Sequence, residues 1–249
     1  MTDLHHEVSG SGPAVVLVHS GVTDSRMWDE QVALLAPRFT VARYDLRGFG
    51  ESPFDPGVFS NLDDLRGLFD ELGIERAALV GNSLGGRIAL EFALEHSERV
   101  TRLVLVAAGL RDHDWSENVR RFGQEEEALL GRGDLDGVVE LNLRMWALPE
   151  VRERVRPMQR RAVELQAGVE AAERPLQPPA SHRLGDVSAP TLVIDGDRDV
   201  HDFRELADRF AREIPGARLE VIAGAGHLPS LERPDEFNRL LLDFLAAPS

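Results

Sequence analysis

One stretch of the chain joins an apolar run to a second apolar run through a short glycine-bounded turn. Residues 77–80 are apolar, residues 81–85 read G-N-S-L-G, and apolar residues resume at helical spacing from residue 88. This order predicts a strand, a sharp turn that presents Ser83, and a helix. Such a turn strains the serine backbone, so the residues two before and two after it must be small. Gly81 and Gly85 meet this demand, and Ser83 is predicted to be a nucleophile.

Strand and helix patterns alternate on both sides of this turn. Strands are expected at residues 4–8, 14–18, 39–44, 77–80, 102–107, 191–194 and 218–222. Helices are expected at about residues 25–35, 61–72, 84–95, 203–214 and 234–245. Several of the strands are apolar throughout, which is typical of strands buried on both faces. The alternation predicts an α/β fold with a mostly parallel sheet flanked by helices.

The alternation stops after residue 109 and returns at residue 189. Between them the sequence shows helical patterns at 124–130 and 135–147, a third helix that we expect to begin at Pro157, and no convincing strand. We therefore predict a core domain of residues 1–109 and 189–249 with a helical lid or cap insertion at residues 110–188. The alternative is that these helices pack on the sheet face like the others.

Composition excludes several classes of chemistry and partner. The 249 residues include no cysteine and no lysine, which rules out disulfides, thiolate metal sites, a cysteine nucleophile and a lysine Schiff base. The formal net charge of -15 repels nucleic acid and anionic lipid, so neither nucleic acid nor membrane is an expected partner. The first residues lack the basic and apolar regions of a secretory signal, so we expect a cytoplasmic protein.

A serine hydroxyl needs an imidazole base that is itself oriented by a carboxylate. The last two expected strands open into loops that carry such groups, namely His227 and the aspartates Asp195, Asp197 and Asp199. The carboxyl ends of parallel strands share one edge of a sheet, where open α/β folds place their sites. Three aspartates at alternate positions also suggest a metal site, but further ligands at calcium-loop spacing are missing.

Further motifs occur in the order found in α/β-hydrolase-fold serine hydrolases, and the chain resembles that family. The matching residues are His19-Ser20-Gly21, Trp28, Tyr44 to Gly50 with Ser52, the serine turn, Gly196 to Asp199, and Gly226-His227. The resemblance implies that Ser83 attacks a carbonyl, that His227 is the general base and then acid, and that Asp199 orients His227. Asp199 is preferred among the three aspartates because the family places its acid three residues after the glycine.

The resemblance also implies an oxyanion hole formed by backbone N–H groups. The expected donors are Leu84, at the start of the helix that follows the serine, and Val22. The helix dipole directs its positive end toward the same spot, which supports Leu84. Ser20 looks like an extra residue in the family's H-G turn, and this leaves Gly21 as an alternative to Val22.

The expected activity is cleavage of a small or medium carboxylic ester or lactone through an acyl-serine intermediate, without a cofactor or metal. Residues 26–29, residues 43–45 and the short insertion resemble enol-lactonases of aromatic catabolism and small bacterial esterases. Serine at position 83, where aspartate would be needed, argues against haloalkane dehalogenase and epoxide hydrolase chemistry. The alternatives are a carbon–carbon bond hydrolase of the meta-cleavage type and a non-hydrolytic ligand-binding or regulatory member of the fold.

The substrate is expected to be a small molecule bound under the insertion. Residues 135–147 carry apolar side chains on two sides, so a helix there needs two surfaces to cover. We expect one side to face the cleft above Ser83. The predicted lining of this pocket is Trp115, Met145 and Trp146.

Overall fold

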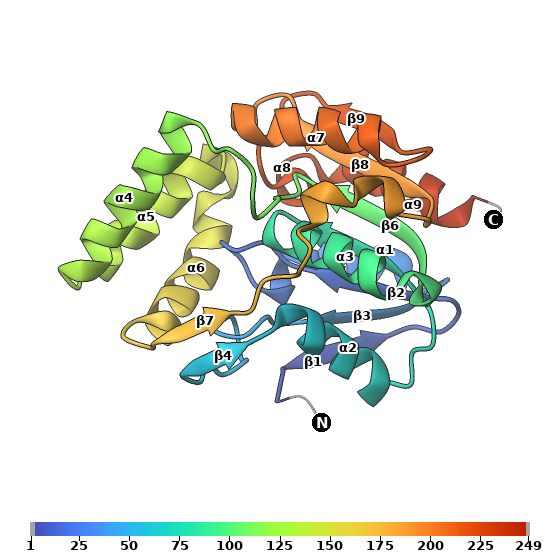
Figure 1. Ribbon diagram of the computed structural model, residues 1–249, viewed down its shortest axis with the longest axis horizontal. Helices are drawn as coiled ribbons and strands as arrows, with labels where there is room; N and C mark the ends of the chain where they lie inside the picture. The colour runs from blue at the N-terminus through green and yellow to red at the C-terminus, as the bar shows by residue number, and fades with distance from the viewer. Residues whose placement is uncertain (1–2, 248–249) are drawn as a thin grey trace.

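The computed structural model describes residues 3–247 and contains a central seven-stranded sheet (Figure 1). In spatial order the strands are β1 (His6–Ser9), β3 (Thr40–Tyr44), β2 (Ala14–Val18), β5 (Ala77–Asn82), β6 (Val100–Val106), β8 (Thr191–Gly196) and β9 (Arg218–Ile222). Only β1 runs antiparallel to its neighbour among the strands of this sheet. The expected α/β fold with a mostly parallel sheet is confirmed.

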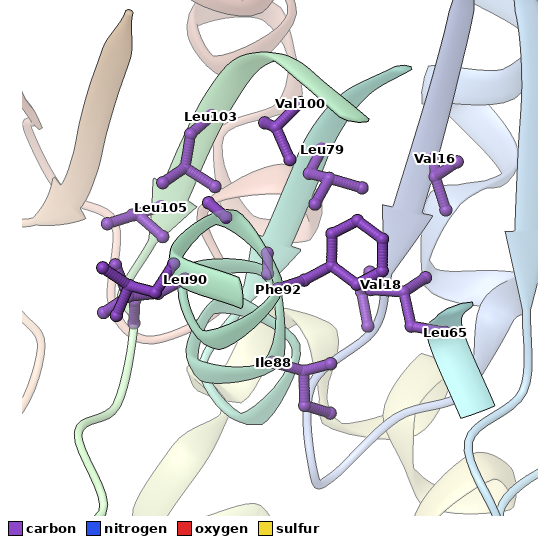
Figure 2. Close-up of a cluster of buried hydrophobic side chains, with 14 of the residues drawn as sticks. Val16, Val18, Leu65, Leu79, Ile88, Leu90, Phe92, Val100, Leu103 and Leu105 are labelled. Atoms are coloured by element: carbon purple, nitrogen blue, oxygen red, sulfur yellow. The ribbon is translucent and has the colours of Figure 1, made fainter. Parts of the chain in front are cut away.

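Helices cover both faces of the sheet because its central strands are apolar on both sides. One layer consists of α2 (Asn61–Glu71), α3 (Leu84–Glu95) and α7 (His201–Glu213), and the opposite layer of α1 (Asp29–Leu35), α8 (Pro229–Glu232) and α9 (Pro234–Ala246). Figure 2 shows the first layer, where Phe92 and Ile88 of α3 lie among side chains of β2, β5 and β6. Each fully buried side chain of this size contributes about 1.5–3 kcal/mol of apolar burial.

The turn between β5 and α3 brings backbone segments into very close contact. Ser83 has φ 54° and ψ -109°, a left-handed conformation that non-glycine residues rarely adopt. A Cβ atom on Gly81 would lie 2.2 Å from the carbonyl oxygen of Gly85, and one on Gly85 would lie 2.3 Å from that of Val18. The two glycines are therefore required by backbone packing, as the sequence pattern predicted.

The segment that interrupts the alternation carries three long helices beside the sheet. They are α4 (Glu117–Gly131), α5 (Leu135–Trp146) and α6 (Arg152–Gln166), which lie together on the left in Figure 1. Helix α4 begins seven residues earlier than expected from the apolar pattern, because Ser116 caps it. Both the N–H and the hydroxyl of Ser116 donate to the Asp202 carboxylate of α7, at 2.6 Å and 2.7 Å.

Two expectations for this segment are wrong. Pro157 lies inside α6 and does not start it, since the proline at the helix entrance is Pro149 of the preceding 3-10 turn. A strand is also present: β7 (Ala171–Glu173) pairs in parallel with β4 (Gly57–Phe59) of the core, and neither is among the expected strands. Three-residue strands are too short to show a periodic pattern, and their pairing depends on contacts distant in sequence.

Replacement of Gly85 by alanine should destabilise the protein by several kcal/mol, because the new methyl group meets carbonyl oxygens of the backbone that cannot move independently. The matched control is Gly123→Ala in α4, where a Cβ atom meets nothing within 4 Å. Alanine there should stabilise the helix by about 0.5–1 kcal/mol. Urea denaturation of both variants measures the difference, and equal effects would contradict the packing argument.

Candidate active site

Three of the predicted residues follow the carboxyl ends of parallel strands. Ser83 comes directly after β5, Asp199 lies three residues after β8, and His227 lies in the loop after β9. Ser83 and His227 line the same cavity, which has a volume of about 910 Å³. Strand ends alone therefore bring groups from distant parts of the sequence to one edge of the sheet.

The imidazole of His227 is paired with one of the three competing aspartates. Its Nδ1 lies 2.9 Å and 3.1 Å from the two carboxylate oxygens of Asp199, and both side chains are buried. The carboxylate of Asp197 instead accepts the N–H of Gly224 at 2.7 Å on the surface. The pairing holds Nδ1 as the protonated nitrogen and leaves Nε2 as the basic atom.

The loop that carries His227 is fixed by two buried polar side chains. Asn82, the residue before the serine, donates its Nδ2 to the His227 carbonyl at 3.2 Å. Glu232 accepts the N–H groups of Gly226 at 2.6 Å and Leu228 at 3.3 Å, and with its other oxygen that of Leu148 at 3.0 Å. Burial raises the pKa of Glu232, while these N–H groups act in the opposite direction.

Aromatic rings enclose the imidazole. The ring of Trp146, at the end of α5, is 4.8 Å from that of His227, and the ring of Phe203 on α7 is 4.4 Å away. Both aromatic residues line the cavity, and only 4% of His227 is exposed. Water is therefore largely excluded from the histidine and its carboxylate partner.

Of the two expected oxyanion donors, one lies at the start of a helix and the other already has a hydrogen-bond partner. Leu84 is the first residue of α3, where helical N–H groups have no intrahelical acceptor. The N–H of Val22 donates to the Ser20 hydroxyl at 3.2 Å. The N–H of Gly21 has no hydrogen-bond acceptor within residues 3–247, and Gly21 lines the same cavity as Ser83.

The cavity lining agrees with the sequence prediction at one of three positions. Trp146 lines the cavity, whereas Met145 lines a shallow hollow on the outer side of α4 and α5. Trp115 packs against His113 and Phe203 outside the lining. Successive helix residues lie about 100° apart around the axis, so Met145, directly before Trp146, lies on a different face of α5 and outside the cavity lining.

Sequence reasoning missed several cavity residues because nothing marks them locally. Phe203 reads as an ordinary core position of α7, and the polar residues of α4, α5 and α6 read as solvated faces. The missed lining residues with polar side chains are Glu126, Asn142, Gln159 and Gln166. Asp197 lies on the surface while Asp199 contacts His227, and within the described part of the chain no group of three His, Asp or Glu residues is arranged to hold a metal ion.

The model of the alpha/beta hydrolase family matches residues 15–240, which span every strand that carries a site residue. The chain belongs to the alpha/beta hydrolase family.

None of the helices within residues 3–247 is long and apolar enough to cross a membrane.

Relatives in this family are hydrolases of more than one kind. The chain is 30% identical to 2-hydroxy-6-oxo-6-phenylhexa-2,4-dienoate hydrolase of Comamonas testosteroni, over 97% of this chain and 91% of that protein. It is also 30% identical to pimeloyl-[acyl-carrier protein] methyl ester esterase of Nitrosomonas europaea, over 95% and 97%. The structure of the enol-lactonase from Burkholderia xenovorans LB400 superposes with a TM-score of 0.80 at 28% identity, covering 98% of this chain and 96% of that one. This family member is accordingly a hydrolase.

A second carboxyl group lies buried behind the His227 partner. Asp195, at the end of β8, is 1% exposed, and its Oδ1 has no hydrogen-bond partner within the described residues. Burial raises the pKa of Asp195 to about 8, and the neighbouring negative charge of Asp199 acts in the same direction. The raised pKa favours the protonated form of the Asp195 carboxyl group at neutral pH.

The raised pKa predicts a stability that falls as the pH rises. Between the ordinary pKa of 3.8 and about 8, unfolding releases the Asp195 proton, so a higher pH favours the unfolded state. Asp195→Asn removes this ionisation. The free energy of unfolding of the variant minus that of wild type should therefore rise by roughly 1 kcal/mol per pH unit between about pH 5 and pH 8. Asp197→Asn, at an exposed carboxylate, is the control. Urea denaturation over this range tests the prediction, which parallel profiles for wild type and Asp195→Asn would refute.

Proposed function

We propose that the protein hydrolyses an uncharged carboxylic ester or lactone through an acyl-serine intermediate. The observation that carries the proposal is the buried Asp199–His227 pair, whose imidazole lines the same cavity as Ser83. A nucleophile, a base and an orienting carboxylate are the parts that acyl transfer needs. The strained turn at Ser83 and the free N–H groups next to it support the same reaction.

In the proposed mechanism, Ser83 Oγ attacks the carbonyl carbon while His227 Nε2 takes the hydroxyl proton. Asp199 holds Nδ1–H and stabilises the imidazolium that forms. The N–H groups of Leu84 and Gly21 receive the negative charge that develops on the carbonyl oxygen. We propose Gly21 instead of Val22 because the Val22 N–H already donates to Ser20. His227 then protonates the leaving alcohol, and water attacks the acyl-serine by the reverse sequence.

The charge of the cavity wall supports an uncharged substrate. Apart from His227 no basic side chain belongs to the lining formed by the described residues, and Glu126 adds a carboxylate. A substrate such as the dienoate named for the Comamonas testosteroni relative carries a carboxylate, which would need a cationic partner in a water-poor site. Ester or lactone hydrolysis is therefore favoured over carbon–carbon bond cleavage of such anions.

We also propose that α4, α5 and α6, within residues 110–188, act as the substrate-selecting lid. All three helices contribute cavity residues opposite Ser83, from Glu126 on α4 to Gln166 on α6. The core thus supplies the reacting groups, while the helices and loops of residues 110–188 supply most of the residues that line the cavity. Pockets of this kind are shaped mainly by apolar side chains with few polar anchors.

Ser83→Ala should lower the turnover of p-nitrophenyl acetate by at least about 10³-fold without unfolding the protein, since alanine fits the same turn. Wild type should react rapidly with a fluorophosphonate probe at Ser83, and the variant should not. Circular dichroism confirms that the fold is kept. Retention of a tenth of wild-type turnover would refute the nucleophile, and labelling without multiple turnover on any ester would favour a ligand-binding protein.

Asp199→Asn should lower kcat/KM for p-nitrophenyl acetate by at least about 10²-fold, because an amide can leave the imidazole in the wrong tautomer. Asp197→Asn is the matched control: its side chain lies two residues away on the surface and does not contact His227. It should change kcat/KM less than about threefold. A larger loss for Asp197→Asn than for Asp199→Asn would overturn the assignment.

A further inference from the structure

One side chain of the cavity is buried with its hydrogen-bonding capacity unused. Gln159 of α6 is 5% exposed and lines the cavity that contains Ser83. Its Oε1 has no hydrogen-bond partner, and no hydrogen bond from its Nε2 occurs within residues 3–247. Buried polar groups are nearly always paired in proteins, because an unpaired one loses its bonds to water without replacement.

The other amides of the cavity wall are satisfied by the protein itself. Asn142 of α5 donates its Nδ2 to Glu126 at 2.5 Å and to the Val138 carbonyl at 3.0 Å. Gln166, two turns along α6 from Gln159, donates its Nε2 to the Gly48 carbonyl at 3.0 Å. Their polar groups hold helices and loops together. Gln159 has no such task.

The surroundings of Gln159 give no structural reason for an amide there. The next cavity-facing residues of α6 are Ala162 and Val163, both buried and apolar. Leucine has a similar size and would fill an apolar wall without an unpaired group. An amide at this position is explained if its partner comes from a molecule that enters the cavity.

We propose that Gln159 is a specificity-determining residue that binds an uncharged hydroxyl or amide group of the substrate, remote from the carbonyl that Ser83 attacks. This inference rests on the proposed function and narrows its substrate class to esters or lactones with a second, polar end. An amide side chain both donates and accepts, and so does a hydroxyl or amide of the substrate. The pairing therefore works with either orientation of the Gln159 amide.

A carboxylate in that place would be bound poorly. The cavity lining includes the Glu126 carboxylate and, among the described residues, no arginine. An amide cannot neutralise a charge, and burial of an unpaired ion is costly. The polar end is thus expected to be neutral.

The test compares esters that differ only at the remote end. In the acyl series these are ethyl esters of straight-chain acids of six to eight carbons that end in methyl, hydroxyl or carboxylate. In the alcohol series they are hexyl acetate and the monoacetate of hexane-1,6-diol. Hydrolysis is followed by proton release, and kcat/KM is measured for each. Wild type should prefer the hydroxyl compound to its methyl partner by about tenfold in one series, with the carboxylate poorest.

Gln159→Leu should abolish that preference and improve turnover of the methyl-ended ester, since no amide then remains to be desolvated. The fold should be kept, because leucine suits the apolar neighbours, and thermal denaturation checks this. Gln124→Leu is the control, which removes an exposed amide of α4 that is not part of the cavity lining and should keep the hydroxyl preference. If Gln159→Leu misfolds, Gln159→Met, which also lacks an amide, must reproduce the loss of the hydroxyl preference.

Failure of this inference differs from failure of the proposed function. If wild type hydrolyses methyl-ended esters through Ser83 but shows no hydroxyl preference in either series, the role of Gln159 is refuted and the hydrolase stands. A hydroxyl preference that survives Gln159→Leu also refutes it. If no ester or lactone is hydrolysed, the proposed function itself fails.

Discussion

The site depends on one close approach of backbone to backbone. At the turn after β5, atoms of Gly81, Gly85 and Val18 lie so near one another that a single methyl group cannot be added. Hydrogen bonds on both sides hold the strained serine. Its N–H donates to the Val106 carbonyl at 2.9 Å, and its carbonyl accepts from the Gly109 N–H at 3.1 Å. The left-handed conformation is thereby imposed by β6 and its following loop, so Ser83 faces the cavity without further adjustment.

The groups proposed to react and the groups that would select the substrate come from different parts of the chain. The groups proposed to react belong to loops at strand ends, which the sheet places rigidly, and His227 is further held by Asn82 from the serine turn itself. The groups that would distinguish substrates belong mainly to helices outside the alternating pattern, such as Gln159 on α6. This division lets the wall vary while the reacting geometry stays constant.

The parts of the structure that follow from local chemistry could be predicted from the sequence. The strand–turn–helix at Ser83, the buried strands and the glycine spacing before Asp199 each leave a local pattern, and these elements agree with the structure. The β4–β7 pair, the position of Pro157 within α6, and the direction of Met145 depend on contacts between distant segments. Gln159 looks like any polar helix residue until its neighbours are known.

The carboxylate of Glu232 has a consequence for how the cavity opens. Since it binds the histidine loop and the Leu148 N–H at once, the end of α5 cannot lift away without pulling on His227. Any outward swing of the helices that keeps this contact pivots at Leu148. The free end is then the turn between α4 and α5, next to which Leu130 of α4 is exposed at the cavity wall.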